Sequence, residues 1–261
     1  MTNQVSIEAI KSFWNSRPCN IRHSNAPFGS RLYFDEVEQR KYFVEPHIPE
    51  FADFGAWSQK KVLEIGCGIG TDAINFARAG ADYTGVDLSI ESLKITQDRF
   101  EIYGLSGRLL EANAEKVHSL FQNEKFDLIY SFGVLHHTPD IEKCFESIHR
   151  LCHKQTKFKF MVYAKNSWKN AMVEAGLDQP EAQQGCPLAN VYSVDEITNL
   201  LQKYGFRVNE MKQDHIFPYV IESYLKYEYQ INPWFEVMPS KMFDALQQRL
   251  GWHLMFEAQI L

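Results

Sequence analysis

The sequence predicts an α/β fold built on a parallel, doubly wound sheet, and two observations predict it. Over residues 57–163, short apolar runs alternate with amphipathic stretches, and the connections between them are short. That alternation is typical of βαβ units, whose parallel strands are covered by helices on both faces. Of the 261 residues, 45% are hydrophobic and 23% are charged, which is ordinary for a globular chain and excludes a disordered one.

The predicted elements follow one another along this region. Ser89 is a typical N-cap, and Gly80 and Gly104 end the first two helices. Beyond residue 163, one more helix and two more strands complete a sheet of seven strands. The sequence thus predicts strands at 61–65, 82–86, 108–111, 126–132, 157–163, 206–211 and 252–258, and helices at 71–79, 89–103, 140–152 and 194–204.

Two further segments flank this sheet. Residues 1–56 are aromatic, charged and punctuated by proline, and they form an N-terminal extension. Residues 214–250 are too long for a plain loop, so they predict a helical cap inserted before the last strand. We expect the rest of the chain, 57–261, to be one domain that carries this cap.

The strongest motif is a glycine turn between the first strand and the first helix. Gly66, Gly68 and Gly70 allow a sharp turn and a close approach of a ligand to the backbone. Asp87 ends the next strand, where a carboxylate accepts both hydroxyls of a ribose. The glycine turn and Asp87 together predict an adenosine-type ligand. No Gly-Lys-Ser/Thr follows, which excludes a P-loop, and Thr71 in place of a third dinucleotide glycine disfavours a nicotinamide-dependent dehydrogenase.

These residues carry a family resemblance. Glu64, the three glycines, Asp87 and the string FDLIYSFGVLHH at 126–137 resemble the class I S-adenosylmethionine-dependent methyltransferases, most of all the group that includes ubiquinone-biosynthesis and other small-molecule enzymes. The resemblance implies a Rossmann-like sheet with an antiparallel last strand and S-adenosyl-L-methionine as cofactor, with S-adenosyl-L-homocysteine as product. It further implies in-line transfer of a methyl group to an O or N atom of a small-molecule metabolite.

The resemblance also implies a cofactor role for each matching position. Glu64 would approach the methionine amino group, and Asp87 would hold the ribose. The other positions would line the methionine, the adenine or the sulfonium; they are Gly66, Cys67, Gly68, Gly70, Leu88, Asn113, Ala114, Ser131, Phe132 and Gly133.

Segments before the first strand often fold over the cofactor as a lid in this family. The resemblance therefore suggests that Arg31 pairs with the methionine carboxylate and that Tyr33 covers the sulfonium by cation–π attraction. The alternative is a helix that packs its aromatic side chains on the edge of the sheet.

Two histidines and a group of polar and aromatic residues are candidates for catalysis and acceptor binding. His136 and His137 follow the fourth strand, and His137 is the favoured general base; the alternative is that both are structural. The residues expected near the acceptor follow the fifth strand or lie in the cap: Tyr163, Lys165, Trp168, His215 and Tyr219.

Other classes of function remain as alternatives. An RNA or protein methyltransferase is disfavoured by the net charge of −6 and by the absence of an Asn/Asp-Pro-Pro-aromatic string after the fourth strand. A non-catalytic cofactor-binding protein stays open. We expect no nucleic-acid or membrane partner, no metal, a cytoplasmic location, and a small-molecule acceptor; the aromatic cap leaves a homodimer open.

Overall fold

The computed structural model describes residues 5–178 and 185–261. Its centre is an eight-stranded sheet in the order β3-β2-β1-β4-β5-β8-β7, with the short β6 paired to β5. β8 runs antiparallel to both of its neighbours, and the other pairings are parallel. The strands are β1 (Lys61–Ile65), β2 (Asp82–Asp87), β3 (Arg108–Glu111), β4 (Phe126–Phe132), β5 (Cys152–Ala164), β6 (Val191–Tyr192), β7 (Phe206–Asp214) and β8 (His253–Ile260).

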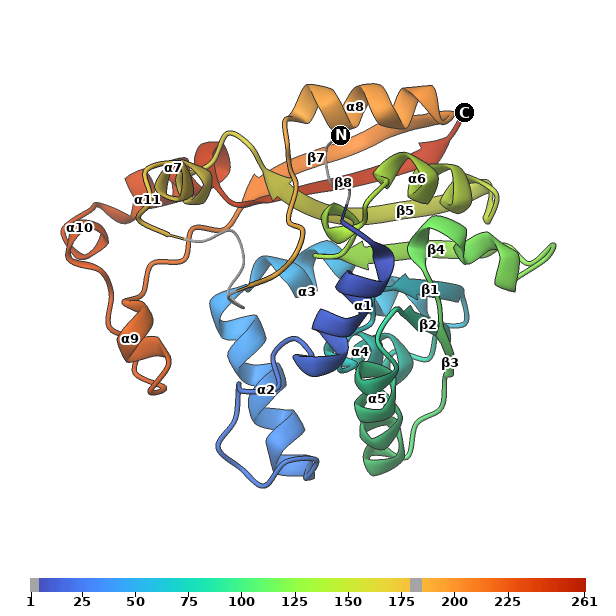
Figure 1. The fold of residues 1–261 in the computed structure, drawn as a ribbon, viewed down its shortest axis with the longest axis horizontal. Helices are drawn as coiled ribbons and strands as arrows, with labels where there is room; N and C mark the ends of the chain where they lie inside the picture. The colour runs from blue at the N-terminus through green and yellow to red at the C-terminus, as the bar shows by residue number, and fades with distance from the viewer. Residues whose placement is uncertain (1–4, 179–184) are drawn as a thin grey trace.

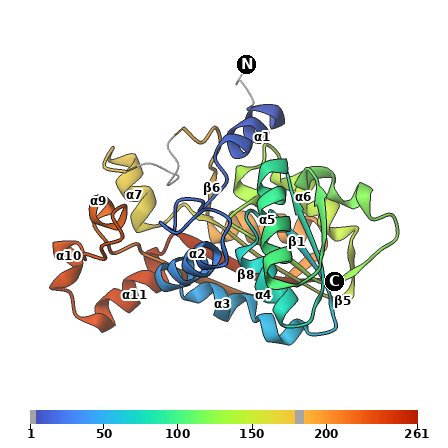
Figure 2. The same cartoon turned by 90° about the horizontal axis from the view of Figure 1, so that it is seen from below.

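The helices lie around this sheet (Figures 1 and 2). The N-terminal region holds α1 (Ile7–Ser16), α2 (Arg31–Val44), α3 (His47–Ala52) and the 3-10 helix η1 (Phe54–Trp57). The sheet region adds α4 (Thr71–Arg78), α5 (Ile90–Tyr103), η2 (Ala114–Leu120), η3 (Leu135–His137), α6 (Ile141–His149), α7 (Trp168–Glu174) and α8 (Val194–Lys203). The cap holds α9 (Ile221–Tyr224), α10 (Pro233–Glu236) and α11 (Ser240–Leu250).

The predicted fold is confirmed, with one added strand and with shifts at the ends of several elements, such as β7, which runs to Asp214, and β8, which runs to Ile260. The sheet gains the two-residue β6, which pairs with the end of β5 and carried no apolar run long enough to predict a strand. The helix predicted at 140–152 ends at His149, because Cys152 already pairs with Phe126 of β4 and begins β5. The antiparallel last strand and the helical cap are both present.

The central strands β1 and β4 are buried on both faces, which explains why they are mostly apolar. On one face Leu63 and Ile129 pack against η2, α6 and α8. On the other, Val62 and Leu128 pack against α3, α4 and α5. Alternate residues of β1 and β4 therefore face opposite layers, as the pleat of a strand requires.

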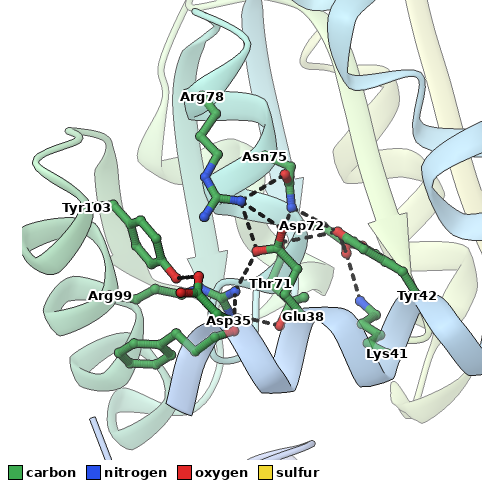
Figure 3. A network of polar contacts seen from close by, with 11 residues as sticks. Asp35, Glu38, Lys41, Tyr42, Thr71, Asp72, Asn75, Arg78, Arg99 and Tyr103 are labelled. Carbon is green, nitrogen blue, oxygen red and sulfur yellow. Dashed lines mark hydrogen bonds and ion pairs between the residues drawn. The ribbon is translucent and has the colours of Figure 1, made fainter. Parts of the chain in front are cut away.

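Polar contacts hold the N-terminal extension against the sheet's helices (Figure 3). Glu38 of α2 accepts hydrogen bonds from the fully buried Arg99 of α5 at 2.9 Å and from Arg78 of α4 at 2.7 Å. Three residues further along the helix, Lys41 donates to Asp72 of α4 at 2.8 Å. One face of α2 is thus fixed beside the turn that begins α4.

Figure 1 shows α7 and the cap helices α9–α11 grouped at the end of the sheet where β4 and β5 finish. In open α/β sheets, ligands bind beyond the carboxyl ends of the parallel strands. The cap is therefore placed over the edge where a site is expected. No helix among residues 5–178 and 185–261 has the length and apolar character needed to cross a bilayer.

Candidate active site

A cavity of about 620 Å³ lies at the carboxyl ends of β1, β2 and β4. Its wall combines the glycine turn, the loops after β3 and β4, helices α1 and α2, and the cap. Most of the predicted site residues line it: Glu64, Gly66, Cys67, Gly68, Asp87, Leu88, Asn113, Ala114, Phe132, Gly133, His137, Tyr163, Trp168, His215 and Tyr219.

The glycine turn has the backbone that its residues predict. Gly66 has φ +81°, and a Cβ there would lie 2.2 Å from a methyl carbon of Val134. Gly68 has φ +55°, and a Cβ there would meet no atom within 4 Å, because the position opens onto the cavity. The first glycine thus lets two loops pack closely, and the second leaves space for a ligand.

Asp87 is held in place by backbone hydrogen bonds. Its Oδ2 accepts from the Gly68 N–H and its Oδ1 from the Ser89 N–H, both at 2.8 Å. Burial raises the pKa of this carboxyl above its usual value, and the backbone N–H groups partly offset that rise. A carboxylate accepts more than one hydrogen bond on each oxygen, and Asp87 lines the cavity.

A buried network of acidic groups lies beneath the turn. Tyr83 donates to Glu64 Oε2 at 2.6 Å, and Asp72 accepts from Lys41 and from the Tyr42 hydroxyl at 2.9 Å. Burial, with the nearby Asp72, raises the pKa of Glu64 to about 8. Burial by itself would lower the pKa of Lys41, but the charge of Asp72 raises it above its usual value. Burial and the neighbouring Asp72 therefore favour the neutral form of the Glu64 carboxyl.

The two adjacent histidines have different surroundings. His137 lines the cavity, and its Nδ1 lies 2.6 Å from the carbonyl oxygen of Leu188. Because a carbonyl only accepts, Nδ1 carries the proton in the neutral ring and Nε2 keeps the lone pair. His136 is fully buried against the Tyr163 ring, 3.7 Å between centroids, and does not line the cavity. Burial lowers the pKa of His136 well below its usual value.

Besides His136, five predicted residues lie away from the cavity wall that the described residues form. The Arg31 guanidinium lies 4.9 Å from the centre of the Tyr103 ring, and Tyr33 is buried with its hydroxyl donating to the Ile21 carbonyl. Arg31 and Tyr33 thus belong to the turn of α2 that packs on α5, and neither is among the residues that line the cavity.

The other three have local structural contacts. Ser131 is buried and donates to the Ile65 carbonyl at 3.0 Å. Gly70 caps α4, where a Cβ would lie 2.8 Å from Thr96 Cγ2. Lys165 lies 3.6 Å from the Glu196 carboxylate, and both side chains are about half exposed. Lys165 is therefore directed to a surface ion pair and not to the acceptor side of the cavity.

The sequence analysis missed several residues that reach the cavity from the N-terminal region. Lys41 and Glu45 line the wall from the end of α2, and Trp14 of α1 packs on His137 with ring centroids 5.3 Å apart. Lys41 lies ten residues, almost three helical turns, after Arg31. The sequence shows Lys41 as a basic residue near the end of a predicted helix. Whether its side chain faces the cavity depends on how α2 packs on the sheet, which the sequence does not show.

Three histidines from distant parts of the chain meet at the acceptor end of the cavity. His47 Nε2 lies 2.9 Å from His253 Nδ1, and the rings of His215 and His253 stack at 4.5 Å between centroids. Burial lowers the pKa of His47 to about 3 and that of His215 to about 3. All three rings are thus uncharged at neutral pH, since burial also lowers the pKa of His253.

Comparison with known proteins places this geometry in a family. Residues 37–211 match the model of the methyltransferase domain. The chain is 26% identical over 193 residues to sterol 4-C-methyltransferase strm-1 of Caenorhabditis elegans, covering 70% of this chain and 57% of that protein. It is 38% identical over 87 residues to a ubiquinone biosynthesis O-methyltransferase of Actinobacillus pleuropneumoniae, covering 31% of this chain and 36% of that protein.

The matched regions therefore span between about a third and a little over half of these curated relatives. Among solved structures, magnesium protoporphyrin IX methyltransferase from Synechocystis PCC 6803, with bound SAH, aligns with a TM-score of 0.64. The alignment covers 98% of this chain and 100% of that one at 15% identity. At that identity the likeness shows a shared fold.

Proposed function

The chain belongs to the methyltransferase domain family, and from that premise we propose that it is an S-adenosylmethionine-dependent enzyme that methylates an O or N atom of a small molecule. One observation carries the proposal: the open backbone at Gly68 and the carboxylate of Asp87 are joined by a hydrogen bond and face one cavity. A glycine turn and a ribose-binding acid form the adenosine half of such a site.

The cavity wall fits the cofactor group by group. Asp87 has acceptor positions for two ribose hydroxyls, and Leu88 offers an apolar surface beside them for adenine. Asn113 uses its side-chain oxygen to cap η2 at Glu115 N, 2.9 Å away, which leaves its N–H₂ group for the adenine edge. Glu64 lies where a methionine ammonium would pair with it, and that charge would favour the ionised form of the carboxyl.

Lys41 takes the role that the sequence analysis expected of Arg31. Both belong to α2, but Lys41 is the one on the cavity wall. Its ammonium has three N–H donors, and one of them is directed to Asp72. We infer that another faces the methionine carboxylate.

Bound S-adenosylmethionine supplies a methyl group on a positively charged sulfur, already activated for displacement. The protein has to align the acceptor with that methyl and exclude water. Phe132 ends β4 and Gly133 follows it, and both line the cavity with Trp14 and residues of the cap. His137 holds its lone pair on Nε2 and is our candidate to take the acceptor's proton.

The acceptor half of the cavity is aromatic with scattered polar groups. Tyr163 stacks on Trp252 at 4.3 Å, and Trp168 packs near Phe235 at 5.5 Å. With His215 and Tyr219 they line the side opposite the glycine turn. A flat, partly apolar acceptor matches these surfaces. The names of the relatives, which include ubiquinone-biosynthesis and sterol methyltransferases, support the same class.

The test is an untargeted transfer assay. Purified protein is incubated with methyl-labelled S-adenosylmethionine and fractionated cell extract, and labelled products are identified by mass spectrometry. A labelled small molecule supports the proposal. Label on RNA or protein alone would replace it with the macromolecular alternative, and cofactor binding without any transfer would favour a non-catalytic binder.

The cap also supports a proposal of self-association. Leu225 is 70% exposed and Val237 is 84% exposed, and Trp234 lies near them in sequence with half of its surface exposed. Apolar side chains concentrated on one segment are typical of an interface. Light scattering coupled to size exclusion should give the mass of a dimer if the cap pairs with a second copy, and 30.4 kDa if it does not.

A further inference from the structure

The histidine cluster is built from three segments that are far apart in the sequence. His47 lies in α3, His215 follows β7, and His253 begins β8. One ring nitrogen of each lies within 4.8 Å of the others. His215 and His253 line the cavity, so the cluster is next to the space where the acceptor would bind.

The backbone at His215 has an unfavourable conformation. Its φ is +77°, a region uncommon for residues other than glycine. The turn is held by Trp252 N–H, which donates to the His215 carbonyl at 2.7 Å, and by Asp214 Oδ1, which accepts from the His215 N–H at 2.7 Å. Within the described residues, the ring itself has no hydrogen bond. The strain therefore presents an imidazole to the cavity, and such strain clusters at functional sites.

His253 has a carboxylate behind it. Its Nδ1 points to His47, and its Nε2 lies 3.7 Å from Glu45 Oε1. A carboxylate at the far nitrogen of a histidine is the usual arrangement behind a metal-bound imidazole, because it orients the ring and raises its basicity. The Phe132 ring packs on His253 at 5.4 Å and on His47 at 6.1 Å, which gives the cluster an apolar surround.

We propose that His47, His215 and His253 bind a divalent transition-metal ion of the Zn²⁺ class, with its fourth coordination position open to the cavity. Three imidazole ligands and one open position are the pattern of catalytic zinc sites. Zinc–nitrogen bonds of ~2.0–2.1 Å place tetrahedral ligand atoms about 3.4 Å apart. The cluster, with 2.9 Å between His47 and His253 and all pairs within 4.8 Å, needs side-chain shifts of about 1 Å to reach that geometry.

The role of the ion rests on the proposed function. A hydroxyl of the acceptor at the open position would become acidic enough to ionise near neutral pH, and its proton would pass to His137, which lines the same cavity. The oxygen lone pair would then form the new O–C bond while the C–S bond breaks and its electron pair stays on sulfur. In this arrangement Glu45 is a positioning residue that acts through His253.

The test is a titration of chelator-treated protein with ZnCl₂ in a calorimeter, and with Co²⁺ followed by its visible absorption. We expect one ion per chain and the strong absorption of tetrahedral Co²⁺. His215→Asn removes the imidazole with a residue that tolerates positive φ and should weaken binding by about 100-fold or more. Glu45→Gln should weaken it by ~10–100-fold. The matched control is His153→Asn, since His153 lies on the surface near Asp127, and it should bind the ion normally.

Absence of one-to-one binding in the wild-type protein, or binding that survives His215→Asn, would overturn the site. The experiments distinguish a failure of the proposed metal site from a failure of the proposed methyltransferase function. Ion binding in a protein that transfers no methyl group supports the site and counts against the proposed function. Methyl transfer that is equally fast after complete removal of the ion overturns the role assigned to it.

Discussion

The two sides of the cavity are built in different ways. The glycine wall, formed by Glu64, Gly66, Gly68 and Asp87, comes from 24 consecutive residues of β1, β2 and the turn between β1 and α4. The histidine wall, formed by His215 and His253 with His47 packed against His253, comes from segments more than 30 residues apart. The first is a local motif whose spacing is visible in the sequence, whereas the second exists only after the chain has folded.

The difference matters for function. Local motifs that bind a shared cofactor recur across a family, but the acceptor is recognised by segments that vary in length and sequence. The glycine wall thus indicates the class of reaction, and the histidine wall should decide which molecule is methylated.

The largest effect on cofactor binding should come from substitutions that fill or remove groups of the glycine wall. Gly68→Trp fills the open space beside the turn, and Asp87→Ala removes the ribose acceptor. We expect the first to abolish S-adenosylmethionine binding and the second to weaken it by ~100-fold, since hydrogen bonds to a charged group contribute about 1.5–3 kcal/mol each. Calorimetry measures both, and Asp98→Ala on the exposed face of α5 is the control. Undiminished binding in Asp87→Ala would remove the ribose assignment.

The ion pair between Lys41 and Asp72 connects the N-terminal extension to the glycine wall. Lys41→Met should lower the free energy of unfolding by about 3 kcal/mol, because it leaves the buried Asp72 carboxylate without its cation. Urea unfolding measures the change. Lys41→Met combined with Asp72→Asn should recover part of the loss, and an equal loss in the double variant would show that the charge pairing is not the cause.

His137 tests whether the reaction needs a base between the two walls. We expect His137→Ala to slow turnover by ~100-fold with the KM for S-adenosylmethionine little changed. Single-turnover rates with the identified acceptor provide the measurement, and His153→Ala is the control. A decrease of less than about threefold would mean that alignment alone accounts for the transfer.

Glu64 should make the free energy of unfolding depend on pH. Its pKa is raised to about 8 in the folded protein, from an ordinary value of 4.5, so the folded state keeps a proton that the unfolded chain loses between these values. Stability should therefore fall as pH rises through that window. Glu64→Gln cannot ionise and should show a shallower decline in urea unfolding between about pH 5 and pH 8. Identical slopes would show that Glu64 is ionised in the folded protein.

The contrast between the local glycine wall and the non-local histidine wall also explains which parts of the fold and the site could be predicted from the sequence. The strands at 61–65, 108–111 and 126–132 were predicted to the residue. For 61–65 and 126–132 the reason is that a strand buried on both faces is a mostly apolar run, whereas 108–111 is an edge strand with two leucines between polar ends. The short β6 was not predicted, because two residues carry no periodicity. Arg31 was named as a cofactor residue and Lys41 was not, although Lys41 lines the cavity, because the sequence does not show which face of the helix meets the cavity.

The sequence by itself determined the order of strands and helices and the glycine turn with its acid, since these depend on contacts between residues close together in the chain. The tertiary structure decided which side chains share the cavity. The antiparallel β8 brings His253 beside the end of β7, and α3 packs at the same edge with His47. No spacing in the chain encodes that meeting, because it depends on how strands and helices from both ends of the sequence pack on one sheet.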